Sequence, residues 1–166
     1  MSRLWAPWRI EYIRTKKDEG CVFCNKSSSN DDQNNLVLFR GEESFVLMNL
    51  YPYSNGHLMI SPYLHTSDTN DISASCNEEI MRLANESMKI LKSKMNAEGF
   101  NFGANLGKAG GAGIEDHLHY HIVPRWNGDT NFMPVVGTTK VMVEGLNETW
   151  VNLKPEFDAI KDIKHA

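Results

Sequence analysis

Three histidines occupy alternate positions in one short stretch, at His117, His119 and His121, and they are half of the six histidines in the chain. An apolar residue stands in each gap between them. Alternation with a period of two is typical of a β-strand, whose successive side chains point to opposite faces of a sheet. At about 3.3 Å per residue the three imidazoles would extend over roughly 13 Å, the size of a small active site. We therefore predict a strand with three imidazoles on one face and a core on the other.

Three interpretations of such a strand differ in chemistry. It could be a histidine-rich surface strand, although neutral imidazoles gain little from clustering without partners. It could hold a metal ion, because histidines at positions i and i+2 of a strand can share one ion. It could also be catalytic, with one imidazole as the nucleophile and its neighbours orienting it and stabilising developing charge. The rest of the chain has to decide between them.

Length and composition describe one domain. The 166 residues are enough for a hydrophobic core, and we expect no membrane partner, since no apolar run approaches the roughly 18 residues of a membrane helix. Arg9, Glu11 and Arg14 interrupt the first 17 residues, so that segment has no secretory pattern. A net charge of -4 gives no basic footprint for duplex nucleic acid. We expect a cytoplasmic protein.

Two of the three cysteines form a C-x-x-C pair, Cys21 and Cys24. Three cysteines are not a disulfide framework, and in a cytoplasmic protein this spacing indicates half of a metal site or a redox pair. The third, Cys76, is expected to be a small buried or partly exposed side chain.

The surrounding pattern predicts an α+β domain with an antiparallel sheet of about five strands and one long helix. Ser75 and Glu78 have the spacing of a capping box, an apolar stripe follows them, and Gly99 marks the end of this helix. Besides the histidine strand, we predict strands over four ranges, of which the first two form a hairpin: 36–40, 45–49, 57–61 and 100–106.

The two ends of the chain are predicted as additions to this domain. Residues 1–20 form an aromatic arm, a candidate oligomer contact because tryptophan and tyrosine are enriched at interfaces. The main domain covers 21–126, with a polar loop over 26–35. Residues 127–166 form a C-terminal extension packed on the domain, with short helical segments expected at both ends and a last helix or tail over 149–165.

A glycine-rich run over 107–113 leads into the histidine strand. It lacks the lysine and serine or threonine of a P-loop, and it precedes a strand rather than the helix of a Rossmann turn. Glycines still allow backbone N–H groups to approach an anion closely. The run is either a flexible turn or a loop that holds a phosphate against a histidine.

The stretch from His117 to Pro124 resembles the signature of the histidine triad (HIT) superfamily of nucleotidyl hydrolases and transferases, and the similarity covers the chain from Cys21 to Trp126. The Trp-Ala-Pro-Trp-Arg segment near the start, the C-x-x-C pair and the Pro-Arg-Trp ending look most like the branch with bacterial diadenosine tetraphosphate phosphorylases. This resemblance implies a HIT-like fold and nucleotidyl transfer on dinucleoside polyphosphates.

The resemblance also implies catalytic roles. His119 would attack the α-phosphorus of a nucleotide through one ring nitrogen, while a backbone carbonyl holds the other as N–H. The product would be a covalent nucleotidyl-histidine intermediate. His121 and His57 match family positions that hydrogen-bond the phosphoryl oxygens and stabilise charge in the transition state.

The nucleotide-binding positions of the family match further residues. Asn49 falls where the family places a side chain on the ribose hydroxyls, although it could simply end its strand. Asn105, Gly111 and Gly113 fall at the phosphate contacts, together with His119 and His121 themselves. A purine nucleotide or dinucleoside polyphosphate is the substrate that the resemblance implies.

The same resemblance implies two further metal ligands beside the cysteines. In zinc-containing members the other two ligands match His65 and His117, so that Cys21, Cys24, His65 and His117 would hold one zinc ion. A closed four-ligand site is structural, and we expect no catalytic metal. A dithiol redox pair is the rival interpretation, but its expected βαβ context is missing.

One departure from the family favours a particular reaction. Hydrolase branches carry a polar side chain three or four residues before the first triad histidine, where this chain has Ile114 and Gly113. The absence of that polar side chain leaves room for inorganic phosphate as the acceptor, so phosphorolysis is our first interpretation. The alternatives are a HIT-type nucleoside phosphoramidate or nucleotide hydrolase, a non-catalytic nucleotide-binding protein, and a zinc hydratase or hydrolase with the triad histidines as catalytic ligands. The family implies a homodimer, to which the aromatic arm could add the contacts of a tetramer.

Overall fold

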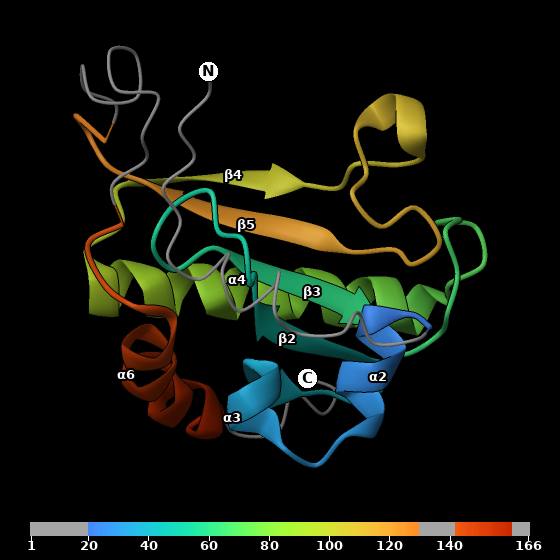
Figure 1. Ribbon diagram of the computed structural model, residues 1–166, viewed down its shortest axis with the longest axis horizontal. Helices are drawn as coiled ribbons and strands as arrows, with labels where there is room; N and C mark the ends of the chain where they lie inside the picture. The colour runs from blue at the N-terminus through green and yellow to red at the C-terminus, as the bar shows by residue number, and fades with distance from the viewer. Residues whose placement is uncertain (1–19, 130–141, 161–166) are drawn as a thin grey trace.

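The computed structural model describes residues 20–129 and 142–160. Five strands form one antiparallel sheet in the order β1-β2-β3-β5-β4 (Figure 1). The strands are β1 (Val37–Arg40), β2 (Ser44–Met48), β3 (Leu58–Pro62), β4 (Gly99–Gly103) and β5 (Tyr120–Arg125). The helices are α2 (Val22–Ser28), α3 (Asp32–Asn35), α4 (Ala74–Met95) and α6 (Leu146–Asp158), with a short 3-10 turn η1 (Lys108–Gly110). The predicted α+β fold with a five-stranded antiparallel sheet and one long helix is confirmed.

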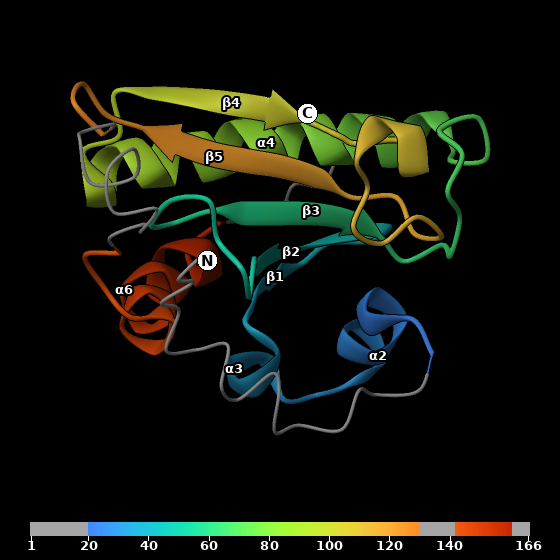
Figure 2. The same cartoon turned by 45° about the horizontal axis from the view of Figure 1, so that its top comes forward.

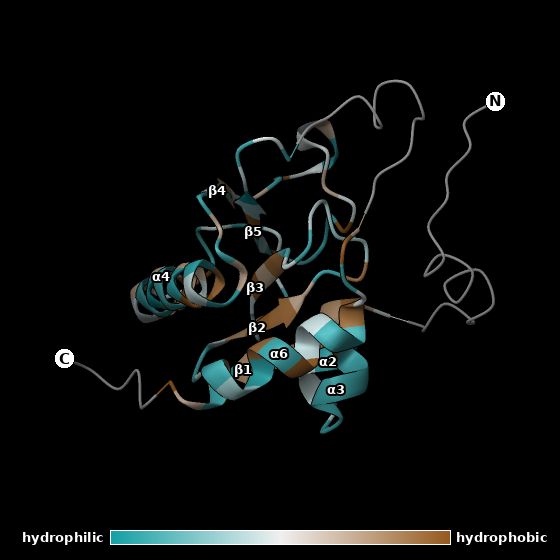
Figure 3. Cartoon of the chain, turned by 90° about the vertical axis from the view of Figure 1, so that its left-hand side faces the viewer, coloured by the Kyte–Doolittle hydropathy of each residue, from teal (hydrophilic) through white to brown (hydrophobic). Residues whose placement is uncertain are grey.

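The sheet is covered on both faces at its centre. Val46 of β2 and Ile60 of β3 face α4 and the main core, whereas Phe45 and Leu47 of β2 face a second cluster with Phe23 of α2. This follows from the period of two along each strand. Figure 3 colours β2 and β3 as hydrophobic strands between α4 and α2. Because both of their faces are covered, the central strands have nearly continuous apolar sequences.

Strand β4 is an edge of the sheet. It pairs with β5 alone and lies away from α2 and α6 in both Figure 1 and Figure 2. Its predicted range was 100–106, but the ladder ends at Gly103, and a loop through η1 connects it to β5. The other strand boundaries differ from the prediction by one residue, except in the histidine strand.

The histidine strand β5 begins at Tyr120, so His117 and His119 precede the ladder. The alternation nevertheless extends through this segment. Leu118 and Ile122 are buried in the core beneath α4, and Tyr120 packs against that core. The predicted division into a core face and a histidine face is confirmed by this burial.

The predicted capping box of α4 is wrong. Ser73, not Ser75, is the N-cap, and its hydroxyl accepts a hydrogen bond from the backbone N–H of Cys76 at 2.9 Å. The helix ends at Met95, where Asn96 adopts a left-handed conformation with φ of 51°, before the predicted stop at Gly99. A left-handed residue at this position is a common way to end a helix. Cys76 is buried, as expected.

A buried carboxylate of α4 organises the β1–β2 turn. Glu79 is 6 % exposed, and it accepts hydrogen bonds from the backbone N–H of Glu42 at 2.6 Å and of Glu43 at 2.9 Å, and from the hydroxyl of Ser44 at 2.7 Å. A Cβ at Gly41 would lie 2.4 Å from a carboxylate oxygen of Glu79. The turn therefore needs a glycine at this position and a carboxylate on α4.

The predicted loop over 26–35 is wrong, since it contains the end of α2 and all of α3. Arg40 of β1 donates hydrogen bonds to the backbone carbonyls of Lys26, Ser27 and Ser29, and pairs with Asp32 at 2.8 Å. These contacts satisfy the carbonyl groups that the end of α2 leaves without partners. A distant arginine therefore caps α2, while Asp31, whose side chain accepts from the backbone N–H of Asn34, is the N-cap of α3.

The C-terminal helix α6 packs on the same core. Leu153 and Phe157 are fully buried there, and the indole N–H of Trp150 donates to the carbonyl of Val37 at 3.0 Å. The last helix expected over 149–165 thus begins earlier and ends at Asp158. The aromatic arm predicted over 1–20 lies, apart from Gly20, outside the described residues. No described helix has the length and hydropathy of a membrane span.

Candidate functional site

The ring of His119 is fixed by the backbone two residues earlier. Its Nδ1–H donates to the carbonyl of His117 at 2.8 Å, and the side chain is 6 % exposed. A neutral imidazole that donates from Nδ1 keeps a lone pair on Nε2. This is the tautomer that a nucleophilic histidine requires. The ring packs edge-on against His121, with centroids 4.9 Å apart.

His57, which directly precedes β3, forms a hydrogen-bonded pair with His121 of β5. The backbone N–H of Tyr53 donates to Nδ1 of His57 at 3.0 Å, which assigns the proton of His57 to Nε2. That Nε2–H lies 3.0 Å from Nδ1 of His121, so His121 accepts there and keeps its own proton on Nε2. Burial, with a smaller contribution from nearby His119, lowers the pKa of His121 to about 4. His121 is therefore a neutral hydrogen-bond donor at neutral pH.

Asn49 stands at the end of β2, where its amide orders the turn to His57. Its Oδ1 accepts from the backbone N–H of Tyr51 at 2.8 Å, and its Nδ2 lies 3.4 Å from Nδ1 of His57. The backbone N–H of Asn49 also donates to the carbonyl of His57 at 2.9 Å. The side chain that was predicted to reach a ribose thus supports the histidine pair in this structure.

The glycine loop connects β4 to the histidine strand through η1. Gly107 and Gly111 have positive φ angles of 67° and 85°, which favour glycine. A Cβ added at Gly111 or Gly113 would meet no atom within 4 Å, so both positions face open space. Asn105 is half-buried and lines a cleft that His121 also lines. These three predicted binding positions share the loop that follows the edge strand.

The four predicted metal ligands come together although 96 residues separate the first from the last. The ligand atoms of Cys21, Cys24, His65 and His117 all lie within 4.8 Å of one another. Nδ1 of His117 is 3.2 Å from Sγ of Cys21, 3.6 Å from Sγ of Cys24 and 3.2 Å from Nδ1 of His65. Sγ of Cys24 is 3.4 Å from Nδ1 of His65.

The four pair distances of 3.2 to 3.6 Å are close to those around a tetrahedral zinc ion. Zinc–sulfur bonds of about 2.3 Å and zinc–nitrogen bonds of about 2.0 Å place two tetrahedral ligands roughly 3.3 to 3.8 Å apart. Nε2–H of His117 donates to the carbonyl of Pro62 at 2.9 Å, which leaves Nδ1 as the ligand atom. Burial, aided by nearby His65 and His119 and opposed by the Pro62 contact, lowers the pKa of His117. The neutral imidazole that a metal requires is thereby favoured.

Phe23 joins the metal cluster to the histidine strand, and sequence reasoning missed it. It lies between the two cysteines and is 1 % exposed. Its ring centroid is 5.2 Å from that of His117 and 4.8 Å from that of His119. Its position inside the C-x-x-C pair was the one sequence signal that could have placed it near the metal cluster. A phenylalanine by itself indicates only a buried side chain.

The family of the chain follows from comparison with known proteins. The HIT domain model matches residues 30–128. The chain belongs to the HIT family. Among HIT relatives, an AP-4-A phosphorylase of Mycobacterium tuberculosis is 35% identical over 162 residues, which cover 90% of this chain and 80% of the relative. A bis(5'-adenosyl)-triphosphatase of Dictyostelium discoideum is 29% identical over 89 residues, 54% of this chain and 59% of that protein.

Solved HIT structures share the fold. A zinc-bound histidine triad family protein from Mycobacterium smegmatis superposes with a TM-score of 0.67 at 23% identity, covering 84% of this chain and 94% of the other. Diadenosine triphosphate hydrolase of Plasmodium falciparum gives a TM-score of 0.60 at 21% identity, with 75% and 76% covered. The family expected from the triad is confirmed. The roles of the individual site residues remain predictions.

Proposed function

We propose that this HIT protein is a nucleotidyl-transferring enzyme that acts on dinucleoside polyphosphates through a covalent nucleotidyl-His119 intermediate. The observation that carries the proposal is the hydrogen bond from His119 Nδ1–H to the His117 carbonyl, which leaves Nε2 unprotonated beside the His57–His121 pair. The identity of 35% over 90% of the chain to an AP-4-A phosphorylase supports this substrate class.

In the first step, Nε2 of His119 attacks the α-phosphorus of the substrate. A nitrogen–phosphorus bond forms, and the bond from that phosphorus to the bridging oxygen breaks. The oxygen leaves with the electron pair on a nucleoside polyphosphate. Nε2–H of His121 is the donor available for a phosphoryl oxygen, and because His57 fixes its tautomer, this donor needs no reorganisation. His57 acts through His121, so it is a positioning residue.

In the second step, an oxygen of inorganic phosphate attacks the same phosphorus, and the phosphorus–nitrogen bond returns its electron pair to Nε2. Diadenosine tetraphosphate would yield ATP in the first step and ADP in the second. Ile114 supports phosphate over water as the acceptor, since its side chain packs against the cluster that contains Phe23 and offers no polar group to a leaving group. Hydrolysis of phosphoramidates or nucleotides is the second candidate, because a HIT relative is a yeast adenosine 5'-monophosphoramidase.

Nucleotide contacts are proposed for the residues around the triad. The ribose is assigned to Asn49, which would have to exchange its present contacts for the ribose hydroxyls. Phosphate oxygens are assigned to Asn105 and the backbone at Gly111 and Gly113, where no side chain obstructs an anion. A purine is the proposed base.

Zinc is proposed as a structural ion held by the two cysteines, His65 and His117. When bound, it would supply a rigid tetrahedral link between the α2 region and the segment that precedes β5. Four protein ligands leave no coordination position for water, which supports a structural role over a hydratase or hydrolase with catalytic zinc. Thiolate ligands persist in a reducing compartment, which supports the proposed cytoplasmic location.

A homodimer is part of the proposal. The edge strand β4 exposes Asn101 and Phe102, and an edge with unpaired backbone groups can pair with a second copy. The aromatic arm would add contacts toward a tetramer. Light scattering of the purified protein decides between these states and a monomer.

The deciding experiment incubates the protein with diadenosine tetraphosphate, with and without inorganic phosphate, and identifies the products. We expect ADP and ATP in the presence of phosphate, whereas AMP and ATP would indicate hydrolysis. Rapid acid quenching followed by mass spectrometry should detect an adenylylated protein, and His119→Ala should bind nucleotide without forming it. A His119→Ala protein that turns over at the normal rate would refute the assignment of the nucleophile. Binding with neither adduct nor products would indicate a non-catalytic nucleotide-binding protein.

A further inference from the structure

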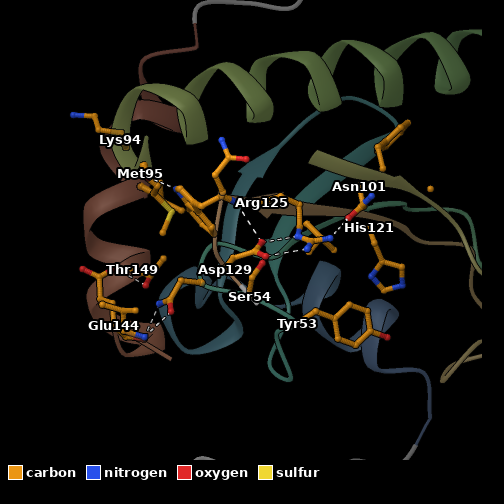
Figure 4. Close-up of a pocket in the computed structure, with 18 of the residues that line it drawn as sticks. Tyr53, Ser54, Lys94, Met95, Asn101, His121, Arg125, Asp129, Glu144 and Thr149 are labelled. Carbon is orange, nitrogen blue, oxygen red and sulfur yellow. Dashed lines mark hydrogen bonds and ion pairs between the residues drawn. The ribbon is translucent and has the colours of Figure 1, made fainter. Parts of the chain in front are cut away.

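A long cleft begins at His121 and continues along the open face of β5 and β4. Its volume is about 1460 Å³, larger than the roughly 300 to 1,000 Å³ of most small-molecule sites. Figure 4 shows His121 and Tyr53 at one end, Arg125 and Asp129 in the middle, and Glu144 of the α6 side at the other. The cleft extends well beyond the triad, to residues at the start of α6, so it has room for more than the group attacked at His119.

The strand register explains the floor of the cleft. His121 pairs with Gly103, Val123 with Asn101 and Arg125 with Gly99. Of these, His121, Gly103, Val123, Asn101 and Arg125 line the cleft. Arg125 is four positions after His121 in β5, which corresponds to roughly 13 Å at about 3.3 Å per residue. Gly103 lies beside His121 in this lining, and a Cβ there would meet no atom within 4 Å, so a side chain at this position would project into the open cleft.

The charges of the cleft are balanced. Among the described residues, two cations, Lys94 and Arg125, and two carboxylates, Asp129 and Glu144, line it. Arg125 pairs with Asp129 at 2.6 Å, and Lys94 pairs at 2.6 Å with Glu156 of α6. A lining without net charge gives little attraction for a polyphosphate chain. It suits a neutral group more than an anion.

Polar amides and one indole provide the remaining lining. Asn101 accepts from the guanidinium of Arg125 at 2.9 Å. Asn105 lies near the triad end, and Trp126, whose indole N–H donates to the carbonyl of Met95 at 3.0 Å, lies near the far end. Amides and a planar ring can hydrogen-bond and stack a heterocyclic base. This lining matches a nucleoside.

We propose that the cleft is the subsite for the leaving nucleoside of a dinucleoside polyphosphate. The inference rests on the proposed function, since it assigns the second half of that substrate. The attacked phosphate lies at His119 and His121, the phosphate chain passes Gly103, and the distal nucleoside occupies the neutral part beyond Val123. Mononucleotide substrates do not use this cleft, so it selects substrates with two nucleosides.

The test compares two substrates with the same adenylyl group, diadenosine tetraphosphate and adenosine 5'-phosphoramidate. Gly103→Val should obstruct the passage and lower kcat/KM for diadenosine tetraphosphate by about tenfold or more, while kcat/KM for the phosphoramidate stays within about twofold. Phe100→Leu is the control in the same strand, since Phe100 does not line the cleft and packs instead against the main core on the other face of the sheet. The control should leave both substrates unaffected.

A second variant is needed because Gly103 pairs with His121, and a valine there could disturb the triad directly. Asn101→Phe fills the cleft one register pair farther from His121 and should produce the same selective loss. Equal losses on both substrates, or no loss on diadenosine tetraphosphate in either variant, would overturn the subsite while the proposed function stands. A wild-type protein that forms no adenylyl adduct from either substrate would instead overturn the proposed function, and the subsite with it.

Discussion

Replacing Phe23 by leucine tests whether the metal-binding segment positions the nucleophile. Phe23 is buried, and its ring lies 4.8 Å from the His119 ring and 5.2 Å from the His117 ring. Leucine is smaller and cannot make the same ring contacts, so His119 should gain freedom to move. A displacement of about 1 Å in a reacting group can cost about 100-fold in rate. We expect the rate of adenylyl adduct formation to fall by about 10- to 100-fold, with a loss in the free energy of unfolding of about 1 to 2 kcal/mol.

Phe45→Leu is the matched control. Phe45 belongs to the same cluster and is also buried, but its ring stacks on Tyr63 at 5.4 Å. Its loss should lower the free energy of unfolding by a similar amount without slowing adduct formation. Single-turnover quenching measures the rate, urea unfolding measures the stability, and metal analysis shows that zinc is retained. Equal slowing in the two variants, or an unchanged rate in Phe23→Leu, would refute the positioning role.

Three further predictions concern metal, pH and the β1–β2 turn. About one zinc per chain is expected by metal analysis, and Cys21→Ser/Cys24→Ser should lose it and melt at lower temperature; metal-free wild-type protein, freshly purified, would contradict the site. The pKa of His121 is lowered from 6.5 to about 4, so between these pH values the unfolded chain binds a proton that the folded protein does not. The free energy of unfolding should therefore decrease as the pH is lowered through this window. Urea unfolding at pH 7 and pH 5 should show a smaller difference in this free energy for His121→Asn than for the wild-type protein. Glu79→Gln replaces a buried carboxylate that accepts three hydrogen bonds and should cost about 2 to 3 kcal/mol in urea unfolding, whereas Glu78→Gln, on an exposed side chain, should cost almost nothing.

The sequence by itself determined the features that depend on local spacing. Alternation predicted the histidine face and the core face of β5, and a continuous helical stripe predicted α4. The C-x-x-C pair indicated half of a metal site, and the triad indicated the HIT family. These predictions succeeded because each rests on the period of a strand or helix, or on a motif contained in a few neighbouring residues.

The tertiary structure decided what depends on distant partners. Residues 26–35 appeared to be a loop partly because the arginine that caps the end of α2 lies farther along the chain, in β1. Asn49 was predicted to contact a ribose, and only the fold showed that its amide also orders the turn to His57. Phe23 drew no prediction from the sequence, and only the fold placed it against two histidines. A hydrogen bond or ring contact needs both partners in place, and only the folded chain brings together partners that local periodicity cannot relate.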